Sequence, residues 1–323
     1  MAYPYTSLKG FTHFGKDSLT HNLLYGIIDF YNWGFLNIGG FSNVYRPTSS
    51  GVYGGAKYRL RYVNDPRYST GQVWEGFRSN WVWETGITFG LQPINPSAVW
   101  INNNYYSLNS SSGYVDYLNG RVIFNQPVAT NATVHTEFSH RIVSFKDTET
   151  PYLQTLMFES YRVDKPDAIT SLSGNWSSLA DTRLQLPCVG VEVSYDGSFS
   201  PYQIAGGQSV HKTINFYVFA ENRDHKDYIT DIIASQNDRG VIIPDRFLMR
   251  TDSRYPLNVD FKGAVTGVYK LQYPEIVAWT GDGGFAWRTA YITNTKVENL
   301  QPINGWLHRA KISSTYTVVE EEI

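Results

Sequence analysis

The pattern of apolar and polar positions is clearest over residues 212–245, where it predicts a strand, a helix and a second strand. Residues 214–220 form an apolar run rich in β-branched and aromatic side chains, which indicates a strand buried on both faces. A helix follows this strand. Asp224 can cap it, and its isoleucines lie on one apolar stripe. Residues 241–243 form a short strand that Pro244 ends. A helix with one apolar face must lie on a sheet, so we expect this unit to anchor the C-terminal half.

A second helix is predicted over residues 17–34. Asp17 supplies a capping oxygen, and Gly34 is a suitable C-terminal stop. The apolar side chains at helical spacing are Leu19, Leu23, Ile27 and Phe30. The apolar arc is broad for an exposed helix. We therefore expect the helix to be buried against its own domain or against another subunit.

Most of the remaining chain has the pattern of β-strands. Asn119-Gly120 lies between two apolar runs and predicts a hairpin, and residues 133–145 read as one long strand. Residues 184–195 alternate as a half-buried strand does. Further strands are predicted at residues 259–270, 275–280, 285–294 and 311–319, with a tight turn at residues 282–284.

These elements predict a mainly β protein, built from β-sandwich or barrel-like domains with a few helices. Its C-terminal half is expected to be α+β, with one helix packed on a sheet. The 323 residues favour two domains. We expect a β-rich domain over residues 1–150 that includes the N-terminal helix, a linker over residues 151–166 and an α+β domain over residues 167–323. The stretch at residues 47–55 is expected to be a long loop and is a candidate subunit contact.

The composition adds an excess of rings and a deficit of charge. Aromatic residues make up 15% of the chain and charged residues 17%. Tyrosine and tryptophan are enriched at protein interfaces, whereas charge is depleted there. Residues 58–88 hold a cluster of rings: Trp74, Phe77, Trp81 and Trp83. This cluster is read as a packed core or subunit contact, with a substrate groove and a sugar-stacking platform as alternatives.

The sequence contains no recognisable catalytic or metal-binding pattern. His135 and His140 are an odd number of positions apart on a predicted strand, so they point to opposite faces. Cys188 is the only cysteine and is expected to be a small core residue. Acids for glycoside hydrolysis are present, as in any chain of this length: Asp29, Glu75, Glu84, Asp116, Glu137, Glu192 and Asp260. We therefore predict no catalytic, cofactor or metal site and no enzymatic activity.

The chain carries a formal net charge of −2 and has no basic block, which disfavours sequence-specific nucleic-acid binding. Its first residues lack a cationic region followed by an apolar one, and no apolar run reaches membrane-spanning length. We expect a soluble protein that folds where thiols stay reduced and has no membrane partner.

Two segments carry a resemblance to a known class. Residues 117–124 read Tyr-Leu-Asn-Gly-Arg-Val-Ile-Phe, and residues 215–221 are followed by Arg223-Asp224 and an isoleucine-rich helix. The chain resembles structural virion proteins of tailed bacteriophages, and the second segment is similar to parts of neck or tail-completion proteins. The resemblance implies a collar, head-to-tail connector or tail component that assembles into rings.

The first hypothesis is a structural virion protein that self-assembles as a ring or collar, with copies of itself and portal, neck or tail components as partners. Its candidate subunit-interface residues are Leu23, Ile27, Phe30, Trp74, Trp81 and Trp83. The alternative is a tail-fibre or baseplate module that binds glycans. Its candidate stacking residues are Trp74, Trp81, Trp83 and Tyr105. A hydrolase of cell-wall polymers is the third hypothesis.

Overall fold

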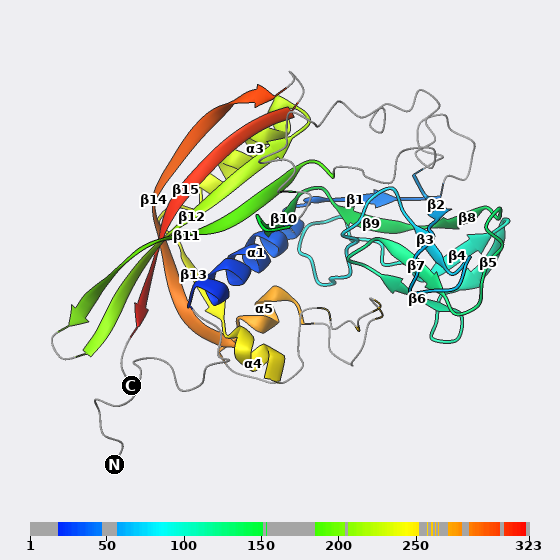
Figure 1. Ribbon diagram of the computed structural model, residues 1–323, viewed down its shortest axis with the longest axis horizontal. Helices are drawn as coiled ribbons and strands as arrows, with labels where there is room; N and C mark the ends of the chain where they lie inside the picture. Colours follow the sequence, from blue (N-terminus) through cyan, green and yellow to red (C-terminus); the bar gives the residue numbers. More distant parts are fainter. Residues whose placement is uncertain are drawn as a thin grey trace, which may run out of the picture.

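The computed structural model describes residues 19–46, 57–150, 153, 185–203, 206–251, 257, 260, 262, 264, 271–279, 284–303 and 307–320. Within them the chain is mainly β, as the sequence predicts, with a few helices against the sheets. Figure 1 shows one sheet of long, curved strands and, beside it, a region of short strands. We call these the long-strand unit and the short-strand unit.

The long-strand unit contains a six-stranded sheet. Its strands, in spatial order, are β10 (Ser144–Asp147), β11 (Cys188–Gln203), β12 (Gly206–Ala220), β15 (Leu307–Glu320), β14 (Ala286–Ile303) and β13 (Gly240–Pro244). β10 pairs with β11 in parallel, and all other neighbours are antiparallel. Two long hairpins, β11–β12 and β14–β15, therefore form the four central strands.

Helix α1 (Leu19–Asn37) fills the hollow of this sheet. It contacts β10 and β11 near one edge and β13 at the other edge. A helix can touch both edges only because the sheet curls around it, as Figure 1 shows. Its residues Leu23, Ile27 and Tyr31 pack in one core cluster with the inward residues of the strands, such as Phe216. The N-terminal helix therefore belongs to the long-strand unit and not to a domain over residues 1–150.

The end of α1 is fixed by glycines beyond Asn37, and not by Gly34 as predicted. Gly39 has φ +86°, and its N–H donates to the carbonyl of Leu36 at 3.0 Å. The N–H of Gly40 donates to the carbonyl of Phe35 at 2.7 Å. This pair of bonds satisfies the last carbonyls of the helix. It requires one residue in the left-handed conformation, which glycine adopts without steric cost.

Helix α3 (Arg223–Ala234) lies on the central strands β12, β15 and β14. It starts at Asn222, whose side-chain oxygen accepts from the N–H of His225 at 2.7 Å, so Asn222 and not Asp224 caps it. Ile229 and Ile233 are its buried isoleucines. The strand–helix–strand order agrees with the prediction, although β14 and β15 lie between β12 and β13.

The short-strand unit has a seven-stranded sheet. In spatial order its strands are β5 (Asn104–Ser107), β4 (Ala98–Ile101), β8 (Val134–Thr136), β2 (Arg59–Tyr62), β3 (Val73–Glu75), β7 (Arg121–Phe124) and β6 (Gly113–Asp116). A two-stranded sheet pairs β1 (Phe41–Val44) with β9 (Phe138–Arg141). The hairpin predicted at Asn119-Gly120 is present between β6 and β7. A second hairpin, between β4 and β5, turns at Asn102 and Asn103, both at positive φ.

Rings fill the core of the short-strand unit. The rings of Trp81 and Phe138 stack at a centroid distance of 4.2 Å, and the indole N–H of Trp74 donates to the carbonyl of Gly71 at 2.9 Å. Both tryptophans thus bury their rings and still satisfy their one donor. Of the three interpretations of this ring cluster, the packed core is the one this geometry matches.

Two short helices, α4 (Arg246–Thr251) and α5 (Tyr273–Ile276), lie between β13 and β14. The segment between them reaches the short-strand unit, because Leu257 is buried in the core cluster around Trp74 and Trp81. The phenol of Tyr68 also donates to the carbonyl of Lys262. This part of the chain ties the two units together.

Several predicted elements differ from the structure. Residues 133–145 are not one strand, because they divide among β8, β9 and β10 in three different sheets. Residues 275–280 begin in helix α5, so they are not a strand. Strands β14 and β15 are both longer than predicted. The loop at 47–55, the turn at 282–284 except for residue 284, and the predicted linker at 151–166 except for residue 153 lie outside the described residues.

Candidate assembly surface

One face of the six-stranded sheet is bare in the described part of the chain. Along β12, Ile214, Phe216 and Val218 are buried, whereas the residues between them are half-buried. The same alternation continues on β15. Helices α1 and α3 cover the buried face, and no described helix or strand covers the other. The predicted strand buried on both faces is therefore buried on only one.

The bare face is polar and its side chains bond to one another. The phenol of Tyr217 donates to Glu192 at 2.9 Å, the amide of Asn215 donates to Glu192 at 3.2 Å, and the hydroxyl of Ser313 donates to Asn215 at 2.8 Å. Burial, followed by the hydrogen bond to Glu192, raises the pKa of Tyr217 to about 12. Tyr217 thus remains a neutral donor at all ordinary pH values. Such a face suits water and does not form an apolar docking patch.

The outer strands of the long hairpins are only half paired. β10 covers β11 from Cys188 to Val191, and β13 covers β14 from Ala286 to Tyr291. Beyond these, residues 192–203 of β11 and residues 293–303 of β14 have no strand on their outer side within the described part of the chain. We call these two stretches the free edges. The N–H groups of Asp196 and Thr295 donate to the side chains of Ser194 and Asn237, and the carbonyl of Gln301 accepts from Arg309. The other outward N–H and C=O groups of these stretches are a template for another strand.

Each free edge contains an irregularity. The pairing of β11 with β12 shifts between Val193 and Gly197. The pairing of β14 with β15 shifts between Thr293 and Lys296 and again between Leu300 and Ile303. Asn294, inside the second bulge, has φ +53°. A polar depression of about 560 Å³ opens on the bare face at this bulge. Its lining residues are Thr213, Asn294, Thr295, Lys296, Ser313, Ser314 and Thr315.

A cavity of about 630 Å³ lies between α1, the loop before β4 and helices α4 and α5. Asp29 on α1 accepts from the guanidinium of Arg246 at 3.2 Å, and Glu84 accepts from Arg141. The Arg246 guanidinium also lies 4.7 Å from the ring centroid of Tyr25. Burial raises the pKa of Asp29 to about 6, and Arg246 opposes this rise.

Each acid of this cavity is thus held by an arginine from another element. Asp29 joins α1 to α4, and Glu84 joins its loop to β9. Among the described residues that line the cavity there is no histidine and no cysteine. The arrangement ties elements together, and it does not present a nucleophile with an adjacent base.

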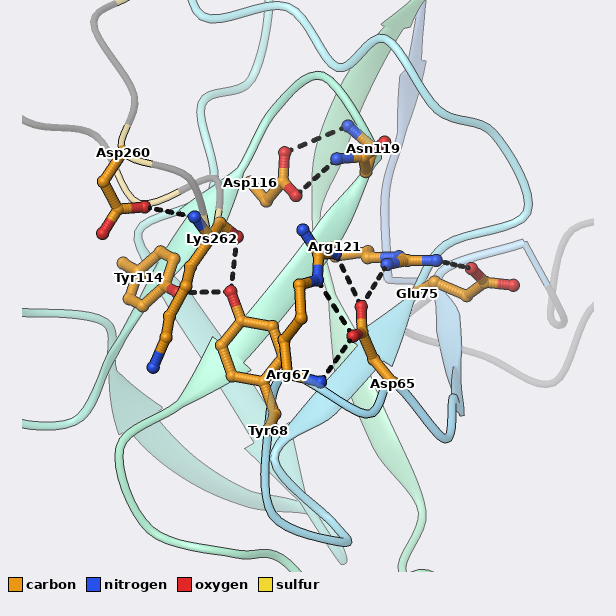
Figure 2. Close-up of polar contacts among 10 residues, drawn as sticks. All are labelled: Asp65, Arg67, Tyr68, Glu75, Tyr114, Asp116, Asn119, Arg121, Asp260 and Lys262. Carbon is orange, nitrogen blue, oxygen red and sulfur yellow. Dashed lines mark hydrogen bonds and ion pairs between the residues drawn. The ribbon is translucent and has the colours of Figure 1, made fainter. Parts of the chain in front are cut away.

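A second polar network crosses the short-strand unit (Figure 2). Arg61, Glu75 and Arg121 are cross-strand neighbours on β2, β3 and β7. Figure 2 shows Glu75 and Arg121 beside Asp65. Arg61 donates to Glu75 at 2.8 Å, and Arg121 donates to Asp65 at 3.1 Å. Hydrogen bonds from Arg67 hold the pKa of Asp65 down at about 2, so this acid stays ionised.

Figure 2 also shows how this network reaches the segment between α4 and α5. The phenol of Tyr68 lies 2.9 Å from the phenol of Tyr114 and donates to the carbonyl of Lys262. The carboxylate of Asp260 accepts from the N–H of Lys262 at 2.8 Å. The carboxylates of Asp65, Glu75 and Asp260 therefore accept from guanidinium and backbone N–H groups. Such bonds hold segments of the chain together.

The histidines and the cysteine singled out by the sequence lie in the interior. Burial lowers the pKa of both His135 and His140 to about 4, and it raises the pKa of the Cys188 thiol to about 12. All three side chains are therefore neutral near pH 7. Among the described residues, no group of three or more His, Cys, Asp or Glu side chains is arranged to hold a metal ion.

The predicted interface residues are mostly core residues. Leu23 and Ile27 have no exposed surface, and Trp74, Trp81 and Trp83 are buried. Phe30 is half-buried, with its ring 5.8 Å from that of Tyr273. A side chain enclosed by its own chain makes no direct contact with another subunit or a glycan. The structure thus assigns these tryptophans to the core and leaves only Tyr105, 63% exposed, of the stacking set.

Sequence reasoning did not identify the free edges. Strand residues show their faces by period two, but the neighbour on a strand's outer side leaves no local pattern. The exposed charges at the two bulges were the available signal. They are Asp196 on β11 and Lys296 on β14, and each strand also carries a glutamate nearby, Glu192 and Glu298.

No described helix is both long and apolar enough to cross a bilayer. Comparisons with protein-family models, with curated proteins and with solved structures find no match for this chain.

Proposed function

We propose that this protein is a non-enzymatic structural component that joins copies of itself, edge to edge, into a closed ring. The observation that carries the proposal is the pair of free edges on the two outer strands of the long hairpins. The resemblance noted in the sequence suggests the setting, which is the neck or tail of a tailed-bacteriophage virion.

The strand directions favour such an addition. β11, β12, β15 and β14 alternate in direction, so β11 and β14 are antiparallel to each other. When β14 of one copy lies beside β11 of the next, the antiparallel order continues without interruption. The two edges are different surfaces, so the contact is head-to-tail, and such contacts close into rings or extend as filaments.

The positions of the free edges favour closure. The free edge of β11 lies toward the end of the sheet where β12 starts, and the free edge of β14 lies toward the other end. A neighbouring copy must therefore shift along the strand direction to bring the two edges together. A shift of this kind at every contact is the shear that a closed barrel of tilted strands needs.

The two faces of the sheet fit this arrangement. Helices α1 and α3 already bury the apolar face within one copy. The bare polar face is continuous across the four central strands and would line one side of the ring. Edge pairing also removes the aggregation hazard of two long unpaired strands.

Native mass spectrometry with electron microscopy of the purified chain tests the ring. We expect one dominant closed oligomer that persists on dilution, with strands continuous across the contacts. A chain that stays monomeric at about 100 μM, where even weak protein contacts are populated, contradicts the proposal.

The virion setting has a separate test. Antibody labelling of purified particles should place this chain at the neck or tail. Particles that lack the chain would reject the setting, and they would leave the ring to be judged by the first experiment.

A further inference from the structure

The two bulges on the free edges carry exposed charges of opposite sign. Asp196 lies within the bulge of β11, and Lys296 lies at the end of the bulge of β14. In both places the antiparallel ladder is interrupted on an outer strand, whereas the third irregularity, between Leu300 and Ile303 of β14, contains no charged residue. Bulges are built features that redirect a side chain or end a pairing, so two of them on complementary edges require an explanation.

Neither charge forms an ion pair within 4.0 Å in the described part of its own chain, although Lys212 lies near Asp196 and Glu298 is two residues from Lys296. The cross-strand neighbour of Lys296 is Ser313, which is neutral, and Asp196 has no cross-strand neighbour because it lies in the bulge. The side chain of Lys212 lies over Gly197, but no ion pair within 4.0 Å joins it to Asp196. The other acid near this edge, Glu192, is already bonded to Tyr217 and Asn215.

We propose that Asp196 of one copy pairs with Lys296 of the next, and that the two bulges meet and set the register of the contact. The inference rests on the proposed ring and names the residues that specify its interface. A one-residue slip would turn the side chains of an added strand to the opposite face. Bulges that meet only at one register, together with opposite charges, exclude such slips and exclude an inverted partner.

Charge reversal with rescue tests the pair. Asp196→Lys or Lys296→Asp places like charges at the contact, and we expect each to raise the concentration needed for assembly by at least tenfold. The double variant restores opposite charges and should assemble at close to the wild-type concentration. Two variants at exposed residues serve as controls, Asp231→Lys on α3 and Lys57→Asp in the short-strand unit. Both should leave assembly unchanged. Light scattering across a dilution series measures all five variants.

A cysteine pair provides a second measurement that does not depend on the stability of the reversed variants. The variant with Asp196→Cys and Lys296→Cys should form disulfides between copies, seen as a ladder on a non-reducing gel. A disulfide forms only where the two Cα atoms lie within about 7 Å, so the ladder reports the register. Native Cys188 is fully buried and is not expected to react.

The outcomes are distinguishable. If wild type forms rings but the reversals do not weaken them, or the cysteine pair forms no ladder, this inference is rejected and the ring proposal stands. If wild type forms no oligomer, both are rejected. If the reversals weaken assembly and the double variant restores it, the pair is established.

Discussion

The two units of the molecule solve the problem of strand edges in different ways. The short-strand unit uses strands of 3 or 4 residues, joined by tight turns and packed around buried rings. The long-strand unit uses strands of 14 to 18 residues in its central hairpins, with two outer edges left half paired. Very short edge strands are a poor template for other chains, whereas long ones recruit them. The proposed assembly therefore involves the long-strand unit.

The two units also shift the pKa of a carboxyl group in opposite directions. In the short-strand unit, hydrogen bonds from Arg67 keep the pKa of Asp65 down at about 2. At the junction with α1, burial raises the pKa of Asp29 to about 6, although Arg246 is beside it. Asp65 therefore stabilises the fold as an anion, and Asp29 does so best when protonated. The difference predicts opposite responses to acid.

The largest expected effect concerns the two faces of one strand. Phe216→Ala removes a fully buried ring from the core around α1, and we expect it to lower the free energy of unfolding by about 3–5 kcal/mol. Thr213→Ala, on the bare face of the same strand, should change it by less than about 0.5 kcal/mol. Urea unfolding monitored by circular dichroism measures both. Equal effects would mean that the bare face is not solvent-facing in the isolated chain.

The next effect concerns Asp29. Its folded pKa of about 6 lies above the ordinary value near 3.8, so the folded state binds its proton more tightly and stability falls as pH rises from about 4 to 6. Asp29→Asn imitates the protonated acid. At pH 7 it should raise the free energy of unfolding by about 1–2 kcal/mol and remove this pH dependence. Unfolding curves from pH 4 to 7, with Asp231→Asn as control, measure this change in the free energy of unfolding. An Asp29→Asn variant that is less stable than wild type at pH 7 contradicts the prediction.

A smaller effect of opposite sign is expected at Asp65. Its folded pKa of about 2 lies below the ordinary value, so its contribution is present above about pH 4 and is lost as pH falls toward 2. Asp65→Asn should lower the free energy of unfolding by about 1 kcal/mol at pH 7, because Arg67 and Arg121 lose their anion. Near pH 2 the variant and wild type should converge. Thermal melts at both pH values measure the difference.

Local patterns predicted much of the secondary structure. The strand–helix–strand order around α3 follows from the spacing of its apolar residues, and the hairpin at Asn119-Gly120 follows from turn chemistry. The prediction failed for residues 133–145, where one unbroken β pattern is shared among three sheets. It failed again for residues 275–280, where a capping box between Gln272 and Glu275 starts a short helix.

The candidate site was harder to predict than the fold. The sequence leaves Trp81 and Trp83 open as core, interface or stacking residues, because rings are common in all three settings, and only packing shows that they are buried. The free edges of β11 and β14 exist because the neighbouring strands β10 and β13 are short. These neighbours lie far away along the chain. A strand's own residues do not encode which strand stops short beside it.

The sequence by itself determined the class of this protein. A mainly β chain with few charges, no repeated metal-ligand spacing and one helix on a sheet follows from periodicity and composition. Only the tertiary structure decided that α1 crosses to the long-strand unit, that the tryptophans lie inside, and that two outer strands remain half paired. The physical reason is that periodicity reports which face of an element is buried, whereas partners, edges and enclosure depend on contacts between distant segments.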